Sequence, residues 1–488
     1  MIYQNPVVLE NNKAGVYDWL LANPSSSQEI EGYASETSVN KGGSIKLFVS
    51  TNSACFSLEV YRMGWYQGLG ARKVFGPITL LGTRQVIPDI DKDTGLIDCA
   101  WINPFILNTF NEDDPTDWLS GIYLVKLTET DTGKQSYITF TIRDDKRKAG
   151  LLVQQNVTTY QAYNNWGGKS LYKWNSTDNK RASKISFNRP YAGNQQNPLA
   201  AYGLGAGEFL CNVQPNNSDY PISNAGWEYN MVRWLESEGY DVAYCTNMDV
   251  HATPELFQNY KAWIAVGHDE YWSWEMRTHL EAALESGVHL GFFSANTGYW
   301  QVRFEASEIN QQENRLMACH KAAKRDPLSL SKDQRHLTTC QWRDEPVTRP
   351  EAQLLGVMYV ADPVDGDIVI SNADHWVFNG TGLENGSRLP GLLGYEVDSV
   401  HDCSPKNIEV LAESPWAKLN DNNVQGVAHI TIYEAESKAL VFAAGTIQWS
   451  WALDDFNTPE LRATWNNPAA QQLTRNVLER FIGLDTAH

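Results

Sequence analysis

A short apolar segment near the middle of the chain ends in glycine and is followed directly by polar residues. Residues 262–266 read AWIAV, residues 267–271 read GHDEY, and a helical pattern begins at Ser273. An apolar run of this length is typical of a buried strand, and a strand followed by a helix is the unit of an α/β sheet. Residues at the carboxyl ends of parallel strands face the crevice where ligands bind. The segment therefore predicts an α/β fold and a site at the edge of its sheet.

Strand and helix patterns alternate on both sides of this segment. Strands are expected at 150–156, 241–245, 263–266 and 288–294, and helices at 226–239, 273–285 and 467–482. Alternation of this kind favours a mostly parallel sheet. We expect an α/β catalytic domain at 149–488, with a polar insertion or loop at 307–350 that lacks clear periodicity.

The first part of the chain has a different pattern. Apolar and polar residues alternate at 55–63, 121–127 and 136–142, and glycine-containing turns separate these runs. Short alternating strands are typical of an antiparallel β-sandwich. We expect such a sandwich over residues 1–145, and the charged cluster at 144–148 is the expected linker to the next domain.

Composition excludes several classes of partner. The net charge is −19, which argues against nucleic acid and against an anionic membrane surface. No segment approaches the roughly 18 apolar residues of a membrane-spanning helix, and we expect no signal peptide. The seven cysteines are widely spaced without a CxxC motif, so we expect free thiols and a cytoplasmic location.

Histidine chemistry belongs to the second half of the chain, because all ten histidines lie at or after His251. His268 and Glu270 are two residues apart and point the same way in an extended chain. In such a pair, one side chain can bind a metal while the other transfers protons. The alternative is a pair that is satisfied by local hydrogen bonds.

Polar and aromatic residues also follow the other predicted strands. Tyr160, Tyr163 and Trp166 come after the strand at 150–156, and Asn296 and Arg303 come after the strand at 288–294. Asn296 is a candidate donor to a developing oxyanion, and Arg303 a candidate partner for an acidic ligand group. The alternatives are a loop amide and a surface ion pair.

Several runs of residues together resemble a known enzyme subunit. The segments at 162–172, 267–273 and 292–303, with β segments at 30–39 and 61–66, resemble the large (beta) subunit of N,N-dimethylformamidase. The resemblance extends from about Ile30 to Ile482. It implies an Ig-like β-sandwich followed by a glutaminase-like α/β domain, and a hydrolase that cleaves the C–N bond of a small linear amide.

The resemblance also implies a mononuclear Fe(III) site. The ligands implied by the matching motifs are Tyr163, Tyr191 and Glu270, with Tyr160 as the alternative to Tyr163. His268 is implied as the catalytic base. Phenolate and carboxylate oxygens are hard donors that suit a trivalent cation, and a phenol with a free pKa of about 10 ionises only if the metal stabilises it.

Further residues are assigned to the same site. Glu396 matches a further glutamate of the family, and Asn296 is the candidate for steadying the oxyanion. We expect Trp166, Trp300 and Arg303 to contact the substrate.

Partners and alternative functions remain open at this point. The resemblance implies a small-molecule amide as the substrate and a separate small subunit that this chain does not represent, and a homo-oligomer is the alternative assembly. One alternative is a non-catalytic carbohydrate- or partner-binding protein. Another is a zinc-dependent hydrolase that uses His268 and Glu270 as ligands.

Overall fold

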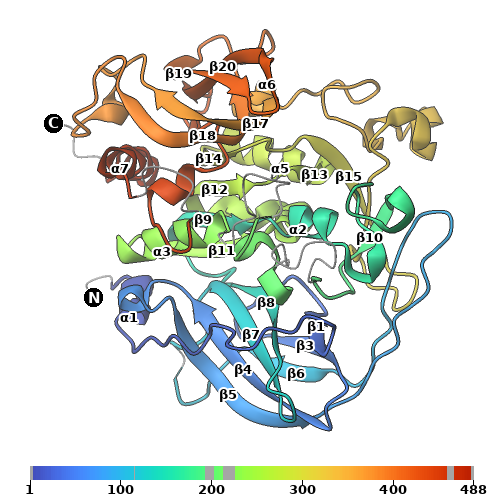
Figure 1. Ribbon diagram of the computed structural model, residues 1–488. Helices are drawn as coiled ribbons and strands as arrows, with labels where there is room; N and C mark the ends of the chain where they lie inside the picture. The colour runs from blue at the N-terminus through green and yellow to red at the C-terminus, as the bar shows by residue number, and fades with distance from the viewer. Residues whose placement is uncertain (1–3, 115, 193–202, 213–225, 459–465, 485–488) are drawn as a thin grey trace. The chain divides into compact units, whose positions relative to one another are not determined.

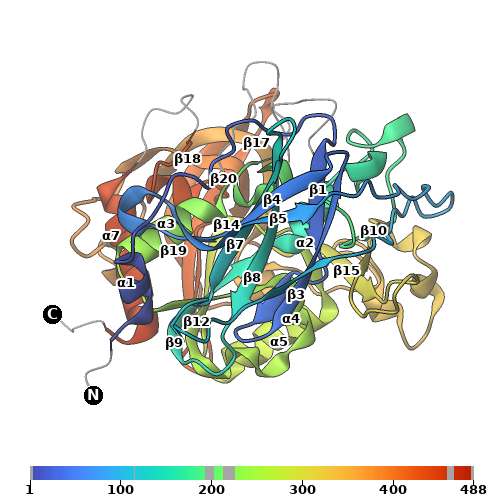
Figure 2. The same cartoon turned by 90° about the horizontal axis from the view of Figure 1, so that it is seen from below.

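The chain is a mixed α/β protein in which strands predominate (Figures 1 and 2). The computed structural model describes residues 4–114, 116–192, 203–212, 226–458 and 466–484. The chain divides into two compact units, each assembled from segments that are separate in the sequence. The first unit comprises residues 1–147, 157–249 and 302–320, and the second comprises residues 148–156, 250–301 and 321–488.

Two β-sheets in the first unit share one apolar core. Their strand orders are β1-β3-β6 and β2-β8-β7-β4-β5. The strands are β1 (Ile30–Ala34), β2 (Ser38–Asn40), β3 (Ser44–Thr51), β4 (Cys55–Met63), β5 (Ala71–Leu81), β6 (Phe105–Asn108), β7 (Gly121–Glu129) and β8 (Gln135–Arg143). These two sheets are the predicted sandwich, but the antiparallel prediction is wrong at β2, which pairs parallel to β8. The reason is that residues 35–37 carry the chain from one sheet to the other without a hairpin.

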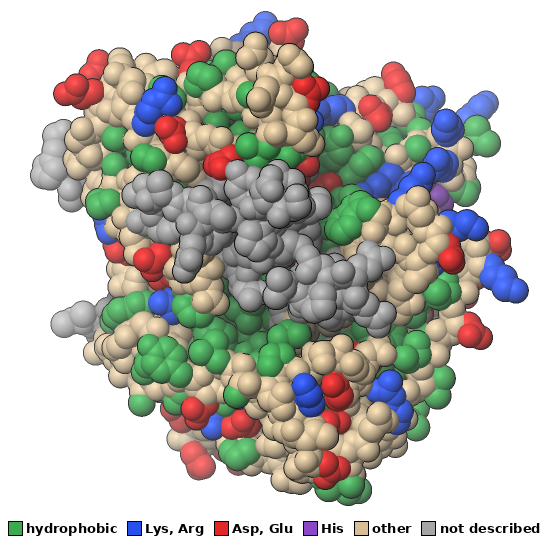
Figure 3. Space-filling view, viewed as in Figure 1, with side chains coloured by type: hydrophobic (Ala, Val, Ile, Leu, Met, Phe, Trp, Pro, Cys, Tyr) green, Lys and Arg blue, Asp and Glu red, His purple; other side chains and the backbone are tan. Residues whose placement is uncertain are grey.

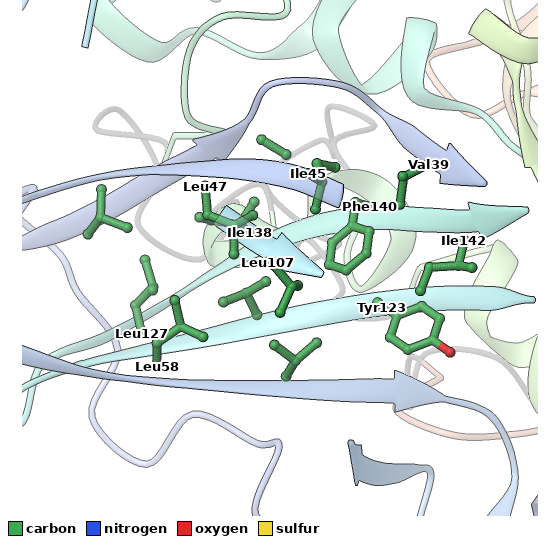
Figure 4. Packing of buried hydrophobic residues seen from close by; sticks show 14 of the residues in the cluster. Val39, Ile45, Leu47, Leu58, Leu107, Tyr123, Leu127, Ile138, Phe140 and Ile142 are labelled. Carbon is green, nitrogen blue, oxygen red and sulfur yellow. The ribbon is translucent and has the colours of Figure 1, made fainter. Parts of the chain in front are cut away.

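Alternating side chains from both sheets fill this core (Figure 4). Ile45 and Leu47 of β3 are buried together with Ile138, Phe140 and Ile142 of β8. Residues two apart lie on the same face of a strand, which is why the alternating sequence pattern predicts this core. Each large aliphatic side chain buried in this way contributes about 1.5–3 kcal/mol to folding.

The segments 157–249 and 302–320 also belong to the first unit. The helices and strands described in 157–249 are α2 (Val157–Tyr163), β10 (Lys184–Ser186), α3 (Glu228–Ser237), β11 (Val242–Thr246) and the start of α4 (Asn247–Ala252), with 3-10 turns that include η2 (Trp166–Gly168); α1 (Pro6–Asn11) lies near the start of the chain. β11 packs beside β8. Arg62 of β4 and Glu236 of α3 form an ion pair of 2.7 Å, and neither side chain is exposed. The sequence predicts a domain boundary between residues 145 and 149. The two compact units are each assembled from separate segments and so have different limits, and the predicted boundary stays a prediction.

The second unit contains a large mixed sheet. The order of its strands is β9-β12-β14-β21-β20-β19-β17-β18. These strands are β9 (Ala149–Gln155), β12 (Tyr260–His268), β14 (His289–Ala295), β17 (Met358–Val369), β18 (Arg388–Ser399), β19 (Glu409–Lys418), β20 (Asp421–Glu434) and β21 (Leu440–Ala443).

Only the first half of this sheet is parallel. Within the described part of the second unit, three strand pairs are parallel and four are antiparallel. The prediction of a mostly parallel sheet is therefore wrong for the half built by residues 358–443. Short links such as the two residues 419–420 between β19 and β20 can join only antiparallel neighbours, whereas a parallel pair needs a long crossover.

The helices of the second unit confirm two sequence predictions. α5 (Trp274–Glu285) connects β12 to β14, and its N-cap is Ser273, whose Oγ accepts a hydrogen bond from Met276 N at 3.1 Å. α7 (Pro468–Ile482) has Asn467 as its N-cap. A further short helix, α6 (Ala352–Leu355), precedes β17.

The predicted insertion at 307–350 is irregular over most of its length. It contains β16 (Leu316–Ala318) and three 3-10 turns: η8 (Ala323–Arg325), η9 (Pro327–Leu330) and η10 (Arg335–Leu337). β16 pairs antiparallel with β10 and with β15 (Trp300–Glu305).

Surface and thiol properties agree with the composition. All seven cysteines lie among the described residues and carry free thiols. No helix in the described part of the chain is long and apolar enough to cross a membrane. Acidic side chains are scattered over the face seen in Figure 3 and are interspersed with basic ones.

Candidate active site

The segment from Ala262 to Glu285 forms a buried strand, a polar turn and a capped helix in the second unit. β12 is buried from Ala262 to its last residue, His268. Gly267 has a φ of +67°, a conformation that strains residues with a Cβ, so glycine allows the chain to bend before the polar turn. Asp269 and Glu270 follow, and β13 (Tyr271–Ser273) leads into α5.

His268, Glu270 and Glu396 form a buried cluster. His268 Nε2 lies 3.5 Å from Glu270 Oε2 and 3.7 Å from Glu396 Oε2. The three side chains are 1%, 4% and 5% exposed, so their charges interact with little screening by water. β12 supplies the histidine and the distant strand β18 supplies Glu396. An imidazole between two carboxylates is suited to accept and pass on a proton.

Glu396 is held in an environment that disfavours its charge. Burial raises its pKa to about 8, the negative charges of Glu270 and Asp362 add to the rise, and His268 and a hydrogen bond from the Asn296 side chain oppose it. A carboxyl group kept neutral at pH 7 can act as a proton donor, which is a common device in active sites.

Asn296 is fixed beside this cluster in a strained conformation. Its φ is +54°, it is 5% exposed, and its backbone N–H donates to Asp398 Oδ1 at 2.9 Å. Its Oδ1 is buried and has no hydrogen-bond partner in the described part of the chain. Residues held in rarely populated backbone conformations cluster at functional sites. Its predicted role toward an oxyanion is untested by this arrangement and stays a prediction.

Backbone and amide contacts hold the polar turn in place. Gln154 Nε2 donates to Asp269 Oδ2 at 2.9 Å and to Asn156 Oδ1 at 3.0 Å. The N–H of Trp300 donates to the Glu270 carbonyl at 2.9 Å. Sequence reasoning missed Gln154 and Asn156, although the polar run that ends the strand predicted at 150–156 was the available signal.

An unpredicted lysine lies beside Trp300. Lys321 Nζ donates to Tyr271 Oη at 2.6 Å and lies 4.8 Å from the centre of the Trp300 ring. Lys321 belongs to the irregular 307–350 segment, whose sequence has no hydrophobic periodicity from which the position of a side chain could be predicted. The substrate contact predicted for Trp300 stays a prediction.

The candidate tyrosine ligands lie in the first unit. Tyr160 and Tyr163 are on α2, and Tyr191 follows β10. The Tyr160 hydroxyl donates to Glu228 Oε1 at 2.5 Å, whereas the Tyr163 hydroxyl accepts from Tyr172 Oη at 2.8 Å. Both hydroxyls thus take part in hydrogen bonds with neighbouring side chains, and the choice between Tyr160 and Tyr163 stays a prediction.

Burial raises the pKa of Tyr160 and of Tyr191, so both phenols favour their protonated form and a phenolate at either position would need a nearby positive charge. Their role as metal ligands stays a prediction. Within the described residues, no group of three or more His, Cys, Asp and Glu side chains has the arrangement of a metal site.

Trp166 and Tyr191 also line a cavity of about 340 Å³ in the first unit. The indole Nε1 of Trp166 donates to Glu31 Oε2 at 2.8 Å. Arg303, the other predicted substrate contact, is half-buried on β15 opposite Ala318 of β16. The arrangement does not test its role.

A buried histidine between two carboxylates, next to the end of a strand in a mixed sheet, defines a class of α/β protein with a candidate acid–base site. Residues 57–465 match the family described as N,N-dimethylformamidase beta subunit-like, C-terminal, and the chain belongs to this family. The match confirms the resemblance found in the sequence.

Other comparisons are less informative. No curated protein matches the chain. The solved structure titled mmIFT52 N-terminal domain is 10% identical, with a TM-score of 0.28, and the match covers 55% of this chain and 95% of that chain. The crystal structure of murine CEACAM1b is 10% identical, with a TM-score of 0.13, and the match covers 26% of this chain and 62% of that one. TM-scores this low carry no argument about fold or function.

Proposed function

We propose that the protein is a hydrolase that cleaves the C–N bond of a small linear, non-peptide amide. The proposed site holds one Fe(III) through Tyr163, Tyr191 and Glu270. The observation that carries the proposal is the buried contact of His268 Nε2 with Glu270 and Glu396, found in a member of the N,N-dimethylformamidase beta subunit-like family.

The roles of the residues follow from their chemistry. When bound, a ferric ion supplies Lewis-acid polarisation of a carbonyl and acidifies a water molecule. His268 accepts the proton of the attacking water at Nε2 and returns it to the leaving nitrogen, so that a C–O bond forms, the C–N bond breaks and an amine leaves. We propose Asn296 as the residue that stabilises the oxyanion and Glu396 as the residue that holds or supplies a proton.

The finer description of the fold is part of this proposal. The two sheets around one core support an Ig-like sandwich. The parallel strands β9, β12 and β14, with His268 at the end of β12, support a glutaminase-like arrangement of the second unit. We also propose a cytoplasmic location, for which the seven free thiols are the support.

The proposal also names the residues that contact the substrate and the partner subunits. Trp166, Trp300 and Arg303 are the proposed substrate contacts. The family is described as a beta subunit, so we propose that a second, smaller subunit or a further copy of this chain completes the assembly.

Metal content and colour test the proposal. Full-length protein purified without chelator should contain about one iron per chain and show a visible tyrosinate-to-iron charge-transfer band. Tyr163→Phe and Tyr191→Phe should each remove or shift the band, and Glu270→Gln should lower the iron content. Tyr17→Phe and Glu285→Gln remove an exposed hydroxyl and an exposed carboxylate and serve as matched controls.

The same measurements separate the alternatives. A colourless protein with one zinc per chain would replace the iron site with a zinc hydrolase that uses His268 and Glu270. Protein with no metal and no release of amine from a panel of simple formamides and acetamides would instead leave a non-catalytic carbohydrate- or partner-binding protein.

A further inference from the structure

A cavity of about 310 Å³ lies in the second unit, at the end of the large sheet opposite to His268. His289, the first residue of β14, and Leu440, the first residue of β21, contribute to its lining. Asn296 follows the last residue of β14, and a strand of seven residues is about 20 Å long. The cavity is therefore separate from the candidate active site, and none of the residues assigned to the iron or to the substrate lines it.

Two histidine rings in the wall of this cavity have fixed tautomers. The backbone N–H of Leu440 donates to His289 Nδ1 at 2.8 Å, and the backbone N–H of Val377 donates to His375 Nδ1 at 3.3 Å. A ring nitrogen that accepts a hydrogen bond carries no proton, so each imidazole has its proton on Nε2. Burial lowers the pKa of both rings, to about 4 for His289, in agreement with neutral imidazoles at pH 7.5.

Both Nε2–H groups are available to a ligand. Neither Nε2 atom makes a hydrogen bond with a described residue, and neither is enclosed by protein. Glu409 Oε2 lies 3.8 Å from His375 Nε2, which is longer than a hydrogen bond. The wall therefore presents two oriented N–H donors that carry no charge.

A guanidinium group adds positive charge to these donors. Arg480 of α7 lines the cavity, and its guanidinium carbon lies 4.4 Å from the centre of the Trp376 ring. The charge of Arg480 acts on His375, whose pKa it helps to lower. Stacking on an indole restricts the orientation of a guanidinium, and the planar N–H groups of arginine match the two oxygens of a carboxylate.

The two carboxylates of the lining lie at its water-exposed side. Glu434 Oε1 pairs with Lys438 Nζ at 2.8 Å, and both side chains are largely exposed. The Glu409 side chain is 58% exposed, whereas that of His375 is 9% exposed. Because water and salt screen exposed charges, the buried donors determine which ligand the interior of the cavity favours.

We propose that this cavity binds a small organic carboxylate, whose oxygens accept hydrogen bonds from His289 Nε2, His375 Nε2 and the Arg480 guanidinium. An ammonium ion offers these donors no acceptor. A metal ion needs ring lone pairs, but a proton occupies Nε2 and a backbone N–H occupies Nδ1 of each histidine. A dianionic phosphate would meet stronger repulsion from Glu409 than a carboxylate does.

Titration calorimetry of the full-length protein with sodium benzoate at pH 7.5 tests the proposal. We expect one site per chain, and at least tenfold weaker binding of neutral benzyl alcohol and of benzylammonium. Arg480→Gln should weaken benzoate binding at least tenfold. Arg388→Gln is the matched control and should leave binding unchanged, because Arg388 is an exposed arginine of the same unit that does not line the cavity.

Substitutions on the two sides of the cavity should have opposite effects. Glu409→Gln removes a negative charge beside His375 and should tighten benzoate binding at least threefold, whereas a site for cations would be weakened by it. His375→Ser should weaken binding at least threefold, and the serine hydroxyl can still accept the N–H of Val377.

Any of four results would overturn the proposal: no binding of benzoate to the wild type, equal affinity for benzyl alcohol, equal affinity in Arg480→Gln, or no tightening in Glu409→Gln. If His375→Ser does not fold, the substitutions at the exposed positions 409 and 480 decide. Glu270→Gln should bind benzoate as the wild type does. Binding at this cavity needs neither iron nor turnover, so the test can fail while the iron proposal stands, and the reverse.

Discussion

Asp398 is a single buried residue whose charge opposes folding. Burial raises its pKa to about 7, and the hydrogen bond from Asn296 N–H and the charge of Arg343 only partly offset this. The unfolded pKa is about 4, so the folded state binds more protons between these two pH values. The contribution of Asp398 to stability therefore falls as pH rises from about 4 to 7 and is constant above that range.

We expect Asp398→Asn to gain stability relative to the wild type over this pH range. The amide can still accept the hydrogen bond from Asn296 but has no charge to bury. The gain should reach about 1.4 kcal/mol per pH unit at most, and thermal unfolding measured at pH 5 and at pH 8 checks it. Asp402→Asn, at an exposed position, should show no such trend. A pH-independent difference between Asp398→Asn and the wild type would contradict the assignment.

Local and distant parts of the site differ in how well the sequence predicts them. His268 and Glu270 lie in one segment, so the strand pattern alone indicates that they share a site. Glu396 reaches His268 from a strand more than a hundred residues later; the local sequence offers no more than a carboxylate after an apolar turn, and the family resemblance assigns it to the site. The positive φ of Asn296 and the buried Glu31 Oε1, which has no hydrogen-bond partner among the described residues, depend on packing between distant segments. No local sequence pattern encodes such packing.

At the scale of elements, the N-cap residue of α5, Ser273, lies three residues after Glu270 of the candidate site and stabilises the start of the helix. Ser273 Oγ accepts from Met276 N at 3.1 Å and lies 2.8 Å from His251 Nδ1. Ser273→Ala leaves the first turn of the helix without its side-chain acceptor. We expect a loss of about 1 kcal/mol in unfolding free energy, measured by denaturant titration.

The matched control for this cap is Thr278→Ala, which changes an exposed hydroxyl within the same helix. Its effect should stay within about 0.5 kcal/mol. Equal losses for Ser273→Ala and Thr278→Ala would show that the cap does not stabilise α5.

Element types follow from the sequence more closely than their partners do. The alternating runs at 55–63 and 136–142 are β4 and β8, and the helix predicted at 273–285 is α5. Hydrophobic period fixes the type of an element because it reports which face is buried. It does not report the direction of the neighbouring strand, and so the parallel β2–β8 pair and the antiparallel half of the large sheet were not predicted.

At the scale of the whole molecule, one buried ion pair joins segments that the sequence assigns to different domains. Arg62 Nη2 and Glu236 Oε1 are 2.7 Å apart with no exposure, and Asn11 and Tyr244 also donate to the Glu236 carboxylate. Glu236→Gln removes the carboxylate in contact with the buried Arg62 charge and leaves only the electrostatic influence of Glu10. We expect a loss of about 3–5 kcal/mol in unfolding free energy, measured in the full chain.

Glu238→Gln is the control for this change, because it removes an exposed carboxylate at the end of the same helix. It should alter stability by less than about 0.5 kcal/mol. If Glu236→Gln is as mild as the control, the ion pair does not join the two segments.

The place of β21 in the large sheet bears on how the protein is made. β21 lies between β14 and β20 and pairs in parallel with Leu290–Phe292, about 150 residues earlier in the chain. In a nascent polypeptide, any β14 strand that forms before residues 440–443 leave the ribosome therefore has one open edge. During that interval the exposed edge is a site where a chaperone, or another incomplete copy, can pair with it.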